Sequence, residues 1–138
     1  MLIKTRIFCM SNDKGTVMGE EVTRKVKKND EGKLLEECDY LGELMHGKRI
    51  IWHPSGVKIS ETDFVQGVMQ GEHISWYLTG NIALKASVVD GDYHGLLTSY
   101  WPNGEKREAG HLDKGERVGI FKSWSDNGEL LAEKNHDQ

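Results

Sequence analysis

The chain has 138 residues, of which 37% are hydrophobic and 29% are charged, so it can form one domain or one short repeat array but not a thick two-layer core. Its formal net charge of −4 argues against a protein that binds nucleic acid or an anionic membrane through bulk positive charge. The sequence has no apolar run near the roughly 18 residues of a membrane span, no signal-peptide pattern and two cysteines, which together predict a cytoplasmic protein without a disulfide framework.

Glycines recur along the chain with a period of 24 residues, which is the mark of a repeat architecture. Thirteen of the 16 glycines fall into three such sets: 47, 71, 95 and 119; 32, 56, 80, 104 and 128; and 19, 67, 91 and 115. Glu43 interrupts the third set, where a glycine would be expected. Five residues after each glycine of the first set comes a large aromatic residue: Trp52, Trp76, Tyr100 and Trp124.

Taken in chain order, residues 1–18 are predicted to cap the array, with MLIKTRIFCM as a strand and SNDKG as a turn. Residues 19–43 are a degenerate repeat, in which Thr23 and Lys28 replace the glycine and the aromatic residue. Four fuller repeats follow, at 44–66, 67–90, 91–114 and 115–138.

Each repeat is predicted to be a β-hairpin, because short segments rich in aromatic and β-branched residues flank a glycine-containing pair. These pairs are Ser55-Gly56, Thr79-Gly80, Asn103-Gly104 and Asn127-Gly128. We expect two-residue type I′ turns there, with a positive φ at both positions. The sequence thus predicts an all-β fold: an elongated, twisted, curved single-layer antiparallel sheet of about five hairpins.

The spacing of glycine, aromatic residue, Asn-Gly pair, second strand and glycine resembles the MORN repeat variant, in the form found in bacterial YwqK-family antitoxins. Residues 91–134 carry the resemblance best, and it extends more loosely over residues 19–135. In the repeat that begins near Val68, ISWYLTGN replaces the usual run of aromatic residue and Pro-Asn-Gly. The resemblance implies an immunity protein that binds a cognate protein toxin and blocks its active site or substrate groove.

Aromatic residues that break the repeat pattern are candidates for toxin binding. The position after each periodic aromatic residue holds His53, Tyr77, Trp101 and Ser125, which strand alternation would place on the opposite face. Tyr77 and Trp101 either cover the second side of a thin sheet or form an aromatic hot spot for a partner. Tyr93 is a third aromatic candidate.

Charged residues between 24 and 43 give a second candidate. Six acids stand against the single Lys33: Asp30, Glu31, Glu36, Glu37, Asp39 and Glu43. A basic cluster precedes them: Arg24, Lys25, Lys27 and Lys28. The two segments either neutralise each other as cross-strand pairs, or the acids form a surface that occupies the basic groove of a toxin.

No catalytic pattern is found, and we expect neither an enzyme nor a cofactor or metal site. The six histidines lack the local spacing of a zinc site, and phosphate-loop and nucleophile-elbow motifs are absent. Cys9 and Cys38 are each expected to fill a small apolar space.

A second function remains open, that of a MORN-type scaffolding or membrane-lipid-associated interaction module. A lipid-binding module would need a continuous basic face, which the net charge disfavours. The last strand, near 129–135, leaves an edge that could pair with a second copy. We therefore expect a monomer or an edge-paired homodimer.

Overall fold

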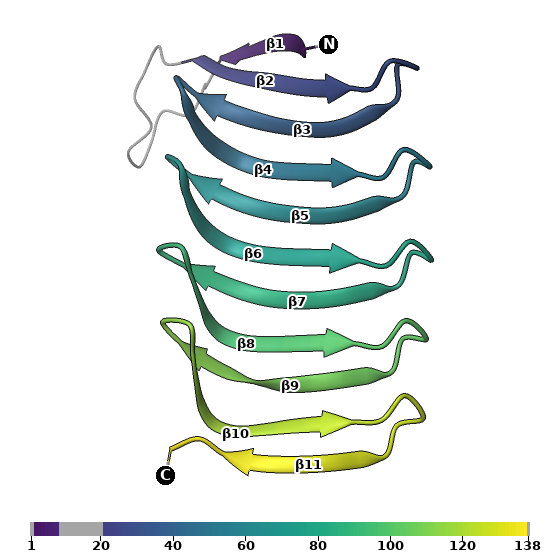
Figure 1. The fold of residues 1–138 in the computed structure, drawn as a ribbon. Helices are drawn as coiled ribbons and strands as arrows, with labels where there is room; N and C mark the ends of the chain where they lie inside the picture. Colours follow the sequence, from purple (N-terminus) through teal and green to yellow (C-terminus); the bar gives the residue numbers. More distant parts are fainter. Residues whose placement is uncertain (1, 9–20, 138) are drawn as a thin grey trace.

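The computed structural model describes residues 2–8 and 21–137, and in them eleven strands form a single antiparallel sheet in strict chain order (Figure 1). The expected all-β fold is confirmed, since these residues contain no helix. The SNDKG turn, Cys9 and Gly19 lie outside the described residues. The strands are β1 (Leu2–Phe8), β2 (Glu21–Lys28), β3 (Leu34–Leu41), β4 (Leu44–Trp52), β5 (Lys58–Val65), β6 (Val68–Trp76), β7 (Ile82–Val89), β8 (Asp92–Tyr100), β9 (Lys106–Asp113), β10 (Glu116–Trp124) and β11 (Leu130–Asn135).

The sheet is an open, curved ribbon in which five hairpins follow one another, beginning with β2–β3 (Figure 1). β4, β6, β8 and β10 bend sharply near their starts, where glycines have positive φ angles: 115° at Gly47, 123° at Gly71, 99° at Gly95 and 63° at Gly119. Because only glycine adopts such angles without strain, the first glycine set marks the bend of each repeat.

The turns that follow the periodic aromatic residues differ from the expected type. In the β4–β5 turn, Gly56 N donates to His53 O at 2.8 Å, and His53 N donates to Val57 O at 2.8 Å. Gly56 has a φ of 95°, whereas neither Asn103 nor Asn127 has a positive φ at the corresponding turns. The predicted two-residue type I′ turns are therefore wrong here: these are three-residue loops, a type I turn closed by a glycine bulge.

Two-residue turns occur at the other edge of the ribbon. Both residues have positive φ angles in Gln66-Gly67 (47° and 86°), Asp90-Gly91 (51° and 89°) and Lys114-Gly115 (51° and 85°), as type I′ requires. The β3–β4 turn at this edge is Gly42-Glu43. There Gly42 has a φ of 64° and Glu43 has no positive φ. A glycine at the first central position is typical of type II′, so the interruption at Glu43 changes the turn type and keeps the two-residue turn.

The two faces of the sheet differ in burial. Along the odd-numbered strands, Cys38, Ala86, Val88 and Leu112 are between 1% and 8% exposed, and Phe121 of β10 is 4% exposed. Side chains opposite one another on adjacent strands share a face, so the register that pairs Leu97 with both Ala86 and Gly110 places these residues together on what we call the core face. Residues of 24-residue spacing at its centre are small: Cys38, Thr62, Ala86 and Gly110.

Candidate functional site

The opposite side of the sheet carries the periodic aromatic residues, and we call it the ladder face. Trp52, Trp76, Tyr100 and Trp124 end β4, β6, β8 and β10 and pair across their hairpins with Lys58, Ile82, Lys106 and Leu130, respectively. The aromatic rings therefore alternate along this face with side chains of the returning strands. Lys58 Nζ lies 4.7 Å from the ring centroid of Trp76, and Lys106 Nζ lies 5.9 Å from that of Trp124, so cation–π contacts link adjacent repeats.

Large apolar side chains are exposed on the ladder face. Leu96 is 53% exposed, Ile120 51%, Leu130 53% and Ile82 36%. Leu96 and Tyr100 share this face with Thr98, and the three line a shallow hollow of about 460 Å³ together with Lys85 and Lys106. The ladder face therefore combines exposed apolar side chains with aromatic rings, and exposed apolar patches of this kind are one mark of association sites in general.

Tyr77 and Trp101 lie in the turns after β6 and β8, where both are half-buried. Tyr77 Oη donates to Tyr100 O at 2.7 Å, and Trp101 Nε1 donates to Trp124 O at 2.9 Å. The guanidinium of Arg107 lies 4.8 Å from the Trp101 ring centroid. Each aromatic side chain thus links its own turn to the next repeat, rather than covering the opposite face of the sheet.

Tyr93 lies near the other end of β8, opposite Val88 on the core face. Its ring centroid is 6.3 Å from that of His73, and its carbonyl accepts a hydrogen bond from Gly115 N at 2.8 Å. At about 3.3 Å per residue, roughly 25 Å of strand separates it from Trp101. The structure therefore does not bring the three aromatic candidates together.

The six acidic candidates are spread over the first complete hairpin. Asp30 and Glu31 are exposed in the β2–β3 turn, and Glu43 is exposed in the turn at the other edge. Along β3, Glu36 pairs with Arg49, whereas Asp39 Oδ1 lies 2.8 Å from Arg24 Nε.

Strand alternation places Glu36 on the face opposite to Glu37 and Asp39, so the acids do not share one surface. The hydrogen bond with Asp39 raises the pKa of the Arg24 guanidinium above its usual value. Neutralisation of the acids by the preceding basic cluster, one of the two readings of the sequence, is what the structure shows for Asp39, whereas Glu36 is paired with Arg49 of the next strand.

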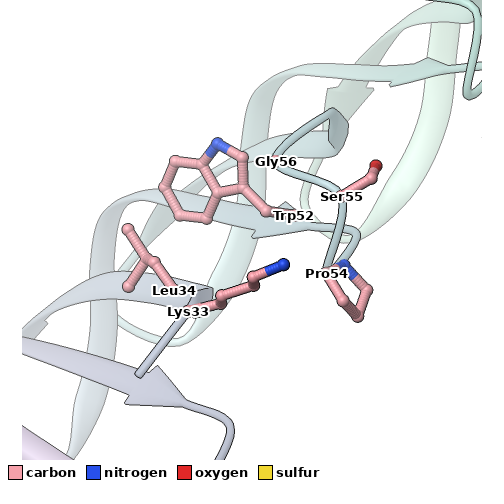
Figure 2. Close-up of a pocket in the computed structure, with 6 residues that line it drawn as sticks. All are labelled: Lys33, Leu34, Trp52, Pro54, Ser55 and Gly56. Atoms are coloured by element: carbon pink, nitrogen blue, oxygen red, sulfur yellow. The ribbon is translucent and has the colours of Figure 1, made fainter. Parts of the chain in front are cut away.

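A pocket of about 390 Å³ opens between the β2–β3 and β4–β5 turns (Figure 2). It is lined by Lys33, Leu34, Trp52, Pro54, Ser55 and Gly56. Figure 2 shows the indole of Trp52 beside Leu34, and the side chain of Lys33 extending toward Pro54. Sequence reasoning missed this pocket, because its walls come from two different repeats.

Burial shifts the pKa values of Cys38, which is buried, and His73, which is half-buried. Burial raises the pKa of the Cys38 thiol to about 11, and burial lowers the pKa of His73, whose Nδ1 lies 2.7 Å from Thr62 Oγ1. In the part of the chain that the structure describes, no three His, Cys, Asp or Glu side chains are placed to hold a metal ion. His46 and His94 instead accept hydrogen bonds through Nδ1 from backbone amides of the next turn, Gln66 N at 3.2 Å and Lys114 N at 3.4 Å.

Comparison with known families identifies one repeat directly. The model of the MORN repeat variant family matches residues 117–138, which contain most of β10 and all of β11. A search of curated proteins finds no match to the chain. Across residues 2–8 and 21–137 there is no helix long and apolar enough to span a membrane. The resemblance to MORN repeats is thus confirmed for the last hairpin.

Proposed function

We propose that this chain is an immunity protein or antitoxin of the YwqK type, which acts in the cytoplasm by binding a cognate protein toxin and covering its active site or substrate groove. The exposed ladder face is the observation that supports this most. Leu96 and Ile120 are each more than half exposed, beside half-buried aromatic rings, and such apolar patches mark sites of protein association.

Inhibition by stoichiometric binding suits an open sheet. Strands held by continuous pairing from β1 to β11 lose little conformational entropy when a partner binds, which favours high affinity. Lys106 beside Leu96 and Tyr100 adds a charge that can fix the register of the complex, while Lys85 Nζ lies 3.7 Å from Glu72 Oε2 in the same hollow. The proposed mechanism requires neither catalysis nor a cofactor, and we expect the inhibitor to be a monomer or an edge-paired homodimer.

Co-expression with the neighbouring open reading frame tests this proposal. We expect that frame to arrest growth when expressed alone and to be harmless when this chain is co-expressed. The double variant Leu96→Glu/Ile120→Glu should lose protection while unfolding at the same temperature, because both side chains are exposed. Leu78→Glu is the matched control, since Leu78 is 56% exposed in the β6–β7 turn and does not line the hollow beside Leu96. Growth arrest that this chain does not relieve would refute the proposal.

The alternative function, a scaffolding or lipid-associated MORN module, is compatible with the family match to residues 117–138. Two cations of the basic strand β2 have partners within the chain: Arg24 pairs with Asp39, and Lys25 Nζ lies 4.2 Å from the ring centroid of Tyr40. These contacts reduce the charge available for lipid headgroups. Sedimentation with phosphatidylserine vesicles separates the two functions, and binding that salt abolishes would favour the lipid-associated module.

A further inference from the structure

The residue that precedes each three-residue loop links neighbouring turns through its side chain in some repeats and not in others. The residues at this position, spaced by 24 residues, are Asn29, His53, Tyr77, Trp101 and Ser125. All five share the same turn backbone, in which their amide and carbonyl groups bond across the turn. The side chains differ in reach. Tyr77 and Trp101 extend to the next repeat, whereas Asn29 Oδ1 accepts hydrogen bonds within its own turn from Glu31 N at 2.9 Å and Lys33 N at 3.0 Å.

The 24-residue repeat implies that a longer side chain at Asn29 would extend toward the carbonyl of Trp52, a residue that lines the pocket between the first and second turns. Tyr77 reaches from the third turn to the carbonyl of Tyr100, and Trp101 reaches from the fourth turn to that of Trp124. Trp52 stands in the corresponding position for Asn29, and its indole lines the pocket. By the same 24-residue equivalence, a tyrosine or tryptophan at position 29 would reach toward this pocket, whereas the side chain of Asn29 bonds within its own turn.

The walls of the pocket define the chemistry of its occupant. Trp52, Leu34 and Pro54 provide apolar surface, and Lys33 provides a cation. The Lys33 side chain is 55% exposed, and its Nζ lies 3.9 Å from Glu31 Oε2. At this distance between exposed groups the ion pair is weak. The Lys33 ammonium can therefore also pair with a carboxylate of a ligand whose aromatic ring occupies the pocket.

We propose that this pocket binds a tyrosine or tryptophan side chain of the toxin, next to an acidic residue, an inference that rests on the proposed function. The ring packs between Trp52, Leu34 and Pro54, and its O–H or N–H donates to the carbonyl of Trp52, as Tyr77 and Trp101 donate to the carbonyls of Tyr100 and Trp124. The neighbouring carboxylate pairs with Lys33. An aromatic anchor in a pocket is the usual form of an interface hot spot.

Short peptides test the pocket without the toxin. The probe is acetyl-Gly-Tyr-Asp-Gly-amide, titrated into the whole chain labelled with ¹⁵N, and the signal is the indole N–H of Trp52. We expect saturable shifts at millimolar peptide. Replacing Tyr by Phe should weaken binding about two- to tenfold, through loss of one hydrogen bond. Replacing Tyr by Leu should abolish it.

Two variants and a control assign the binding to the pocket. Asn29→Tyr places a ring in the interval and should abolish the shifts, since the shared turn backbone already carries tyrosine at position 77. Lys33→Gln should remove the preference for Asp over Asn in the peptide, a difference of about two- to fivefold. Lys27→Gln, at an exposed lysine outside the pocket, should change neither the peptide-induced shifts nor the preference for Asp over Asn. Equal shifts with the Leu peptide, unchanged shifts in Asn29→Tyr, or no shift at all would each overturn the proposal.

Growth assays separate this proposal from the proposed function. If the unaltered chain protects cells and Asn29→Tyr protects them equally well, the pocket proposal is wrong and the antitoxin function stands. If the unaltered chain gives no protection, the antitoxin function is wrong, and the peptide titration still decides whether the pocket takes an aromatic–acidic pair.

Discussion

At the scale of single residues, Gly71 combines two constraints. Its φ is 123°, and a Cβ there would lie 2.6 Å from Asp63 Oδ2. That oxygen accepts a hydrogen bond from Glu72 N at 3.0 Å, so it is held in place. Gly95, the equivalent residue one repeat later, has a φ of 99° but would place its Cβ 3.5 Å from Ser87 Cβ, an ordinary contact.

The difference predicts unequal effects of alanine. Gly95→Ala should lower the free energy of unfolding by about 1–3 kcal/mol through backbone strain alone. Gly71→Ala should lower it further, because the methyl group also displaces Asp63. Urea denaturation of both variants measures the two values, and equal losses would contradict the role assigned to Asp63.

His73 should make stability depend on pH. Burial lowers its pKa in the folded chain below the usual 6.5, so the unfolded chain binds the proton more readily. The free energy of unfolding is therefore unaffected by His73 above about pH 6.5 and falls as the pH drops from there toward the lower native pKa. Urea denaturation between pH 5 and pH 8 should show this fall, reduced in His73→Gln. An unreduced fall in that variant would assign the effect to other groups.

At the scale of elements, side chains link neighbouring turns in part of the array. Tyr77 and Trp101 make such links through their side chains, and Asn81 and Asn103 add side-chain bonds to Pro102 O at 2.8 Å and Asp126 O at 2.6 Å. These bonds join the third, fourth and fifth turns. The side chains of Asn29 and His53 instead bond within the first and second turns.

Tyr77→Phe should lower the free energy of unfolding by about 0.5–1.5 kcal/mol, the usual contribution of one hydrogen bond. The proposed toxin neutralisation should be unchanged, because the hydroxyl is used within the chain. Tyr40→Phe provides a comparison at a tyrosine whose ring receives Lys25. Denaturation and co-expression assays check both effects, and lost protection by stably folded Tyr77→Phe would restore this residue as a binding candidate.

The sequence predicted the hairpins but not their turns. The 24-residue period follows directly from repeated glycines and aromatic residues, so the strands could be placed. Asn-Gly occurs in both two- and three-residue loops, and the choice depends on the pairing of Trp52 with Lys58 rather than on residues 55 and 56. Likewise the sequence identified Tyr77 and Trp101 as aromatic residues that break the repeat pattern. Their hydrogen bonds to the next repeat depend on the distance between neighbouring turns, which the sequence does not show.

At the scale of the whole molecule, the unequal turn links predict a gradient of local stability. Hydrogen exchange in repeat arrays reports local opening, and the first two turns lack the side-chain links found among the last three within the described chain. Backbone amides of β4 and β5 should therefore exchange faster than those of β8 and β9. Trp101→Phe should reduce the difference, and uniform exchange in the unaltered chain would show that the links contribute little.

Throughout the described chain, every strand pairs with its immediate neighbours in sequence. Because no described hairpin pairs with a segment distant in sequence, only a short loop closes at each step of folding. Folding can therefore advance from one repeat to the next while the ribosome is still adding residues. A chain built in this way can complete its early hairpins before its synthesis ends, and under the antitoxin function proposed above this shortens the interval in which a newly made toxin acts without its inhibitor.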